Sequence, residues 1–425
     1  MNLTQIAEQV LAFVAADGVL LSEDLTQVEA ALLTQVRRIG AKAVELHLGR
    51  QKLGYVGAAR PCPCGRVQRF VGYRPKALAT QLGTVRMRRA YYRCGHCGAS
   101  ALPYDQQVGL GDSQVSVGLA QGATLLGIQG PFAPAGETLY QLTGQRLSER
   151  SVERLTEQVG AVAATQEAAQ AAAIADWRAP AAEVQPQRLY VAVDGTMVHQ
   201  QDGWHEAKCV TCYWDEPDGT QQARYAVRFA DAPAFVGFVW ALACRCGLER
   251  AKEVVLLGDG AKCIWEHIGG LLKEATCIVD WYHALEHVWN CGRALHGEET
   301  PETRAWVQEY EGLLWEGQVR TILERLRSEH DRTRSPPKRA ALQELITYVA
   351  NQDDRLAYDR FRAAGLDIGS GRVEAACKHV VGLRMKQSGM RWSAAGSQNT
   401  LSLRVAWLNG DWNRIWASHP LARAA

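Results

Sequence analysis

The order of hydrophobic patterns after Arg188 constrains the fold of this chain more than any other feature. Three consecutive runs have the length and alternation of strands and are separated by Asp-Gly turns that favour hairpins: RLYVAVDGTMVH, HEAKCVTCYW and ARYAVRFA. A helical run then precedes the apolar strand EVVLLGD, a helix is expected from residue 261 to about 273, and the apolar strand ATCIVD follows. Three antiparallel strands followed by helix, strand, helix and strand is the order of a ribonuclease H-like fold.

Two aspartates occupy positions of this pattern where carboxylates have a chemical use. Asp194 lies inside the first apolar strand, and Asp259 ends the fourth. In a ribonuclease H-like fold these two strands are neighbours, so we expect both carboxylates to lie side by side. An unpaired carboxylate in a buried strand is costly unless it binds a cation. The alternatives are a water-facing edge residue for Asp194 and a simple turn residue for Asp259.

A third acid, Glu374, follows the glycines of IGSGRVEAACK at the start of a predicted helix. Glycines before a helix let backbone amides approach a phosphate, and the helix can direct a carboxylate to the same place. Lys378 lies one turn later on the same face and could reach that phosphate. The alternative for Glu374 is a first-turn acid stabilised by the helix dipole. Two carboxylates on strand ends and one on a late helix is the arrangement that holds two magnesium ions for phosphoryl transfer on nucleic acid.

The fifth strand ends in Asp280, three residues before His283. This pair could support the catalytic site, bind metal, or connect the helix to the strand by a hydrogen bond, and the last role is the commoner one. Asp280 is the second choice, after Asp259, for the second metal ligand.

Two cysteine pairs, PCPCGR and YYRCGHCGAS, flank a stretch that alternates like short strands. We expect a zinc ribbon whose ligands are Cys62, Cys64, Cys94 and Cys97. The first pair is spaced more tightly than usual, so His96 could replace Cys62. Free thiols or a redox pair are the alternatives. Cys209 and Cys212 lie three apart on a strand and point to opposite faces, so we expect no chelation by that pair.

Positive charge is concentrated in two stretches, residues 60–93 and 375–410, which hold fourteen Lys and Arg and no acid. Without them the net charge of +2 falls to −12, which favours a polyanion that binds at defined places, although two solvated faces are the alternative. The segment ETLYQLTGQRLSERSVERL adds a helix-turn-helix pattern that a plain helical hairpin would also give. Stacking of Trp392 on a base is a further expectation, with core packing as its alternative. The residues expected to contact DNA are Arg66, Arg69, Arg74, Lys76, Arg86, Arg88, Arg89, Arg93, Arg150, Arg154, Arg384, Lys386, Arg391 and Trp392.

The sequence has no apolar stretch approaching 18 residues, and its N-terminus has no pattern of a signal peptide, so we expect a cytoplasmic protein without membrane contact. The predicted class is an α+β multidomain protein with a ribonuclease H-like core that contains an all-helical insertion. The expected regions are 1–56 helical, 57–107 zinc ribbon, 108–184 helix-turn-helix-like region with linker, 185–293 first part of the core, 294–364 helical insertion, and 365–425 C-terminal part of the core.

The motifs CPCG, RAYYRCGHCG, VDGTMV, LLGDGAK, VDWYHALEHVW and GSGRVEAACKHVVGLRMKQSGMRW together resemble bacterial insertion-sequence transposases of the ISKra type, which belong with the Mutator-like DDE transposases. The resemblance covers nearly the whole chain, and the last motif is the most specific. It implies that Asp194, Asp259 and Glu374 are the DDE triad, and it matches Asp280 and His283 to an acid-x-x-His signature.

The activity that this resemblance implies is cleavage and joining of DNA with two Mg²⁺ ions, which Mn²⁺ could replace, beside a structural Zn²⁺. The implied partners are double-stranded DNA, as element terminal repeats and target, and further copies of the chain in a homodimer or larger assembly. Two other classes are considered: a domesticated DNA-binding protein that does not cut, and a ribonuclease H-like nuclease. Neither needs the whole combination of triad, zinc ribbon and helix-turn-helix.

Overall fold

The structure, a computed structural model, describes residues 2–16, 24–108, 110, 113–262, 264–272, 274–369 and 371–418. Ser370 of the glycine-rich motif lies outside these residues. Contacts divide the chain into two compact units, Met1–Val162 with Asp411–Ala425, and Ala163–Gly410. Each unit is described by itself below.

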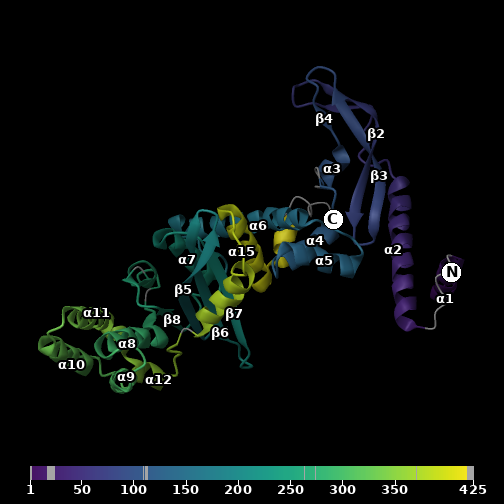
Figure 1. Ribbon diagram of the computed structural model, residues 1–425. Helices are drawn as coiled ribbons and strands as arrows, with labels where there is room; N and C mark the ends of the chain where they lie inside the picture. The colour runs from purple at the N-terminus through teal and green to yellow at the C-terminus, as the bar shows by residue number, and fades with distance from the viewer. Residues whose placement is uncertain are drawn as a thin grey trace. The chain divides into compact units, whose positions relative to one another are not determined.

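The first unit combines helices with a four-stranded antiparallel sheet of order β1-β2-β3-β4 (Figure 1). Its strands are β1 (Ala59–Pro61), β2 (Val67–Thr80), β3 (Gly83–Cys94) and β4 (Ser100–Ala101). Its helices are α1 (Leu3–Ala16), α2 (Leu25–Gly49), α3 (Pro103–Gln107), α4 (Val117–Gly127), α5 (Phe132–Thr143) and α16 (Trp412–Ser418). Helices α1 and α2 lie in the N-terminal region predicted to be helical, whereas residues 50–56 of that region are not helical. The region between the cysteine pairs differs from expectation, because it forms two long strands rather than several short ones.

Helices α5 and α6 (Glu149–Ala172) have the helix-turn-helix form that the sequence predicts. Helix α5 ends at Gly144, which has a φ of 68°. This left-handed conformation favours glycine, so the residue can stop the helix and redirect the chain. Ser148 then accepts a hydrogen bond from the backbone N–H of Ser151 at the start of α6.

The second unit contains a five-stranded mixed sheet of order β7-β6-β5-β8-β9. The strands are β5 (Arg188–Gln200), β6 (Gly203–Asp215), β7 (Gln221–Arg228), β8 (Glu253–Gly258) and β9 (Thr276–Val279). The pairs β5–β6 and β6–β7 are antiparallel, whereas β5–β8 and β8–β9 are parallel. All five strands predicted from the sequence are present. The helix expected from 261 to 273 is instead a short π-helical segment, η2 (Ile264–Gly269).

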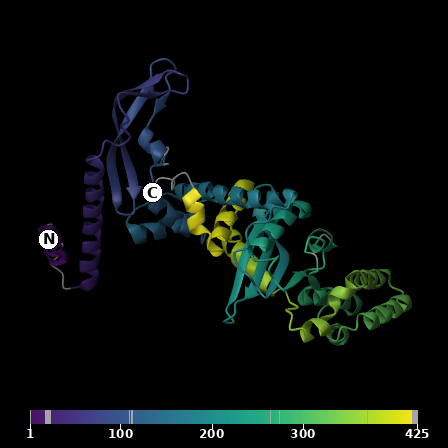
Figure 2. The ribbon, with the colours of Figure 1, turned by 180° about the vertical axis from the view of Figure 1, so that it is seen from behind.

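Helical segments cover the two faces of this sheet. Helix α7 (Ala232–Arg245) lies on one face, where the ring of Phe238 packs under the Arg228 guanidinium of β7 at 4.4 Å. The other face is covered by α13 (Gly371–Ala376), the π-helical η4 (Cys377–Gly382), α14 (Leu383–Met385) and α15 (Ala394–Leu408). Helix α15 lies beside β7 in opposite views of the ribbon (Figures 1 and 2).

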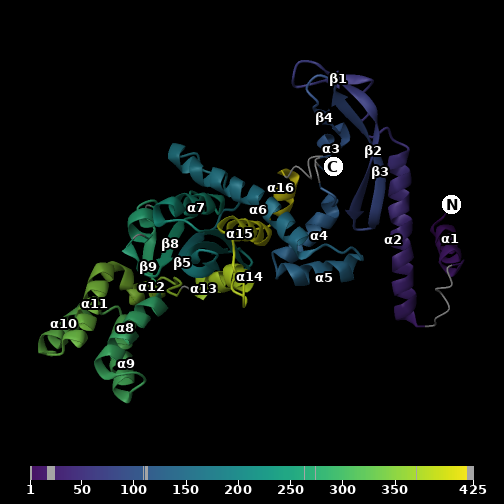
Figure 3. The same ribbon diagram turned by 45° about the horizontal axis from the view of Figure 1, so that its top comes forward.

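Between β9 and α13 the chain is helical, and these helices gather in one group (Figure 3). They are α8 (Trp281–His296), α9 (Pro301–Trp315), α10 (Val319–Arg332), α11 (Pro336–Gln352) and α12 (Tyr358–Ala363), with the short 3-10 helix η3 (Asp353–Leu356). Their buried side chains join those of the sheet in one hydrophobic core, so the group is packed onto the sheet rather than attached by a linker. Across the described ranges, no helix has the length and apolar character needed to cross a membrane.

Candidate functional site

Asp194 and Asp259 lie at matching positions on neighbouring parallel strands. Ala192 of β5 pairs with Leu257 of β8, and each aspartate follows two residues later. Asp280 occupies the corresponding position next to β9. Gly258 of β8 pairs with Val279 of β9, and the backbone N–H of Asp280 donates to the carbonyl of Gly258 at 2.8 Å. The three aspartates therefore lie at one level of the sheet, at the C-terminal ends of β8 and β9 and in the middle of β5.

Burial disfavours the charged form of Asp194 at this level of the sheet. Burial raises the pKa of Asp194, and the charge of Asp259 raises it further, whereas the Gly195 N–H at 2.7 Å and the charge of His283 lower it. The pKa of His283 is raised to about 9, mainly by its hydrogen bond to Asp280 and also by the charges of Asp194 and Asp259. These interactions favour the imidazolium form of His283, whose positive charge would lie beside the aspartates.

A pocket of about 70 Å³ opens beside the two aspartates, between the sheet and α7. Asp194 and Asp259 line it together with Phe235 and with two residues of β6, Glu206 and Lys208. The sequence analysis did not select Glu206 and Lys208. The signal was available, because they are a charged pair two apart on an alternating strand and therefore on one face.

The loop that carries Asp259 is fixed by helix α11. The amide of Gln352 donates to the carbonyl of Gly260 at 2.7 Å, and the Asp259 side chain accepts from the Ala261 N–H at 2.8 Å. Gly260 has a φ of +95°, and a β-carbon there would lie 3.0 Å from the ring of Tyr348. The chain therefore needs glycine after Asp259, and a helix about 90 residues away in sequence holds the catalytic candidate in place.

Asp280 is fully buried and already engaged by helix α8. Its Oδ1 accepts from the backbone N–H of His283 at 2.8 Å and lies 2.9 Å from the imidazole Nδ1. The carboxylate caps the helix and orients the ring, which are structural functions. Asp259 is only half-buried and is one of the residues that line the pocket.

Glu374 lies on α13, which packs on β5 and β6. Cys377, one turn later, hydrogen-bonds both Asp194 and Cys209, so this helical run reaches the face that carries Asp194. The Glu374 carboxylate pairs with Lys378 at 3.6 Å. It does not converge with the two aspartates at ligand distance, because the one group of three or more ligand atoms within 4.8 Å among the described residues is a cysteine cluster.

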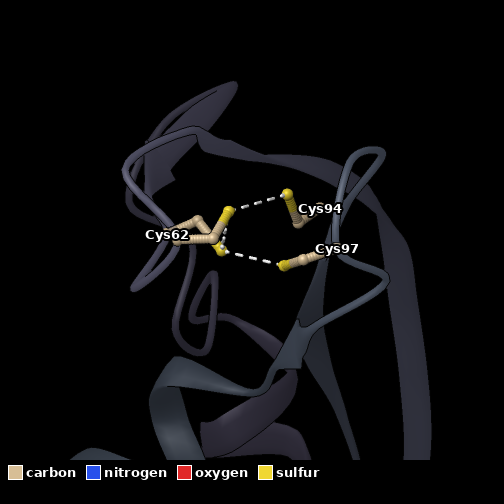
Figure 4. A group of neighbouring side chains, drawn as sticks. Cys62, Cys94 and Cys97 are labelled. Carbon is tan, nitrogen blue, oxygen red and sulfur yellow. Dashed lines mark hydrogen bonds between the residues drawn. The ribbon is translucent and has the colours of Figure 1, made fainter.

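That cluster consists of Cys62, Cys64, Cys94 and Cys97 (Figure 4). The Sγ atoms of Cys62 and Cys64 lie 3.4 Å apart, those of Cys62 and Cys97 3.5 Å, and those of Cys64 and Cys94 3.7 Å. Four sulfurs bound tetrahedrally to zinc at about 2.3 Å would be about 3.8 Å apart. The cluster could therefore bind zinc with little movement, and Cys62 belongs to it, so His96 is not needed as a ligand.

Backbone hydrogen bonds lower the pKa of one cysteine of this cluster. The N–H groups of Cys97 and His96 hydrogen-bond the sulfur of Cys94 and lower its pKa to about 6. These hydrogen bonds favour the thiolate of Cys94, which is the form that ligates metal. Cys209 and Cys212 have different partners, because Cys209 contacts Cys377 whereas Cys212 contacts Cys246, as expected for residues on opposite faces of β6.

A protein-family model described as an uncharacterised protein family (UPF0236) matches residues 24–417. The chain belongs to this family. No curated protein matches it. The matched range contains the four cysteines and the three acids of the predicted triad, so membership in UPF0236 extends over both candidate sites.

The basic residues of this UPF0236 member divide into exposed and buried groups, and four predicted DNA contacts must be corrected. Arg89 is 6% exposed and, like Lys76, forms an ion pair with Asp105. Arg384 is 0% exposed and lies 4.6 Å from the ring of Trp392, which is itself buried. These side chains support the fold because their partners lie inside it. The exposed ones are Arg66, Arg69, Arg74, Arg86, Arg88, Arg93, Arg150, Arg154, Lys386 and Arg391.

Proposed function

We propose that the protein is a DDE-type DNA transposase, which binds the ends of an insertion sequence and cuts and joins DNA strands. The observation that carries the proposal is the register of Asp194 and Asp259. It brings two partly buried carboxylates to one level of the sheet beside a pocket, where burial raises the pKa of Asp194.

The topology supports a ribonuclease H-like core. Strands β5, β6 and β7 are consecutive and antiparallel, and β8 and β9 add in parallel on the other side of β5. Helices cover both faces of the sheet, and the group α8–α12 precedes the helix that carries Glu374. This arrangement is the one expected of such a core with an all-helical insertion.

Hard divalent cations such as Mg²⁺ prefer carboxylate oxygens, and the donors at this level of the sheet fit that preference. Asp194 and Asp259 would hold them, and Glu374 would join after exchanging its Lys378 contact for the metal. Bound there, Mg²⁺ would activate water or a 3′-hydroxyl and stabilise the leaving oxygen at phosphorus. The engagement of Asp280 with α8 favours Asp259 over Asp280 as the second ligand, and Asp280 would act by orienting His283.

Other residues would position the DNA. Lys386 hydrogen-bonds Thr196 of β5, two residues after Asp194, so its ammonium lies close to the level of the aspartates. Lys378 is 81% exposed and becomes available to a phosphate when Glu374 turns toward the aspartates. Zinc in the cysteine cluster would fix the β2–β3 hairpin, and Arg150 and Arg154 of α6 would face DNA.

The test uses the full-length protein and a supercoiled plasmid that carries the coding sequence with its natural flanking DNA. With Mg²⁺ we expect strand breaks at discrete flanking positions and joined products. Asp194→Asn, Asp259→Asn and Glu374→Gln should each lower both by more than about 100-fold, since even loss of an outer-shell partner of a metal ligand costs about 10–100-fold. Glu302→Gln, an exposed acid on α9, is the matched control and should act like wild type.

The outcomes separate the rival classes. Discrete cleavage without joined products would replace the transposase by a nuclease. Binding to the flanking DNA without any metal-dependent break would support a DNA-binding protein that does not cut. Normal joining by Asp194→Asn would refute the assignment of these aspartates as the catalytic site.

A further inference from the structure

The first unit contains a groove of about 410 Å³ between the end of helix α2 and the β2–β3 hairpin. Four basic residues line it, Arg50 and Lys52 from the end of α2 and Arg86 and Arg88 from β3. Tyr73, Met87 and other uncharged residues complete the wall, and no acidic residue lines it. From the sequence, residues 1–56 could be a plain helical cap or an oligomerising or DNA-contacting helical arm. The combination of the end of α2 with the hairpin is visible only in the tertiary structure.

The pleat of the hairpin explains which basic residues reach the groove. Arg86 and Arg88 are two residues apart and therefore lie on one face of β3. Arg89 lies on the opposite face, where it is buried against Asp105. A run of arginines that is nearly continuous in sequence is thus divided between a buried ion pair and an open basic groove.

The four basic residues of the groove have no ion-pair partner among the described residues. The acid that interacts with one of them is Glu45, which accepts from the backbone N–H of Arg86 at 2.7 Å, pairs with Lys42 and also attracts the charge of Arg86. The helix dipole stabilises a basic residue at the end of α2, which explains Arg50, but it does not explain the arginines on the facing strand.

We propose that this groove binds the sugar–phosphate backbone of DNA. Concentrated positive charge without internal counter-ions attracts a polyanion, and guanidinium groups match the geometry of phosphate oxygens. The Tyr73 ring and the aliphatic stems of the basic side chains offer apolar surface to the sugars. The hairpin that carries Arg86 and Arg88 ends at Cys94 of the cysteine cluster, so bound zinc would hold the groove wall rigid. This inference deepens the proposed function by naming a surface that holds the substrate.

The test measures fluorescence anisotropy of a fluorescein-labelled DNA duplex of arbitrary sequence, titrated with full-length protein over a range of KCl concentrations. The main variant is Arg50→Gln with Lys52→Gln, because only the structure implicates these residues. Each lost phosphate contact lowers the slope of log K against log salt by about 0.9, so two lower it by about 1.8. If wild type and variant bind equally at 1 M salt, where the electrostatic contribution vanishes, this slope difference makes the variant bind roughly 60-fold more weakly at 0.1 M salt.

Two controls make the result specific to the groove. Arg304→Gln with Arg327→Gln removes the same charge from exposed, unpaired positions on α9 and α10, and should leave the slope unchanged. Arg50→Lys keeps the charge and should keep the slope, which a misfolded protein would not do. If the main variant has the slope and Kd of wild type, the groove does not bind DNA.

The cleavage assay keeps this outcome separate from the proposed function. Normal binding by the groove variant, with cleavage that still depends on Asp194, would overturn the groove and leave the transposase standing. Weaker binding by the groove variant, with no cleavage by wild type, would support the groove and refute the transposase.

Discussion

Removal of one cysteine ligand should weaken zinc binding by an amount that the cluster geometry allows us to estimate. We choose Cys94→Ser, because Cys94 is buried and its pKa is lowered to about 6 by two backbone N–H groups, so it is the best prepared ligand. The observed Sγ separations of 3.4 to 3.7 Å lie close to the value of about 3.8 Å for tetrahedral zinc, so little binding energy is spent on rearrangement.

Structural zinc sites bind with about 10–16 kcal/mol. If the four bonds contribute equally, loss of one removes about 3 kcal/mol, or roughly 100-fold in Kd. In wild type, free zinc at about a thousand times its Kd stabilises the folded first unit by about 4 kcal/mol. Most of this stabilisation should disappear in Cys94→Ser at the same zinc concentration.

The assay combines zinc content per chain after dialysis with thermal unfolding in buffered zinc and in excess chelator. We expect one zinc per wild-type chain and a chelator-sensitive transition. Cobalt substitution should give the visible bands of a tetrahedral tetrathiolate. Cys277→Ser, a half-buried cysteine on β9, is the matched control and should keep both zinc and transition. A wild-type protein that folds and binds DNA equally well with and without zinc would refute the reasoning.

Two further predictions concern packing and buried charge. Gly237→Ala should destabilise the second unit by about 1–3 kcal/mol, because the new β-carbon would lie 2.7 Å from the carbonyl oxygen of Ala171. Gly312→Ala in helix α9 meets no atom within 4 Å and should stabilise the same unit by up to about 1 kcal/mol. Denaturant unfolding of both variants tests the pair, and changes of the same sign in the free energy of unfolding would contradict the prediction. Asp105→Asn should lower the free energy of unfolding by about 3–5 kcal/mol, since it leaves Arg89 and Lys76 buried without their counter-charge. Glu137→Gln breaks an exposed ion pair with Arg146 and should change the midpoint of denaturant unfolding very little.

Local chemistry explains why several features could be predicted. Strand length and alternation are encoded within a few residues, so all five strands of the second unit could be found from the pattern around Asp194 and Asp259. The cysteine cluster could be found for a similar reason, because two close pairs flank one hairpin. The helix expected after Asp259 was shorter than predicted, since periodicity gives helix type but not length.

The same local pattern could not decide which charged side chains are exposed. Arg86, Arg88 and Arg89 are the same residue type and lie within four positions of one another in the sequence, yet the first two line a groove and the third is buried. Trp392 and Arg384 stack on each other inside the fold instead of forming an open surface. Burial depends on what packs against a residue, and that partner lies elsewhere in the chain.

By itself, the sequence determined the order of the strands, the acids that end them and the four cysteines with metal-ligand spacing, because each is fixed by neighbours along the chain. The tertiary structure alone decided that Asp280 is committed to His283, that Glu206 and Lys208 join the pocket of Asp194, and that the end of α2 meets the β2–β3 hairpin. These arrangements result from long-range pairing and packing, in which the free energy of contact is shared between segments that the sequence separates.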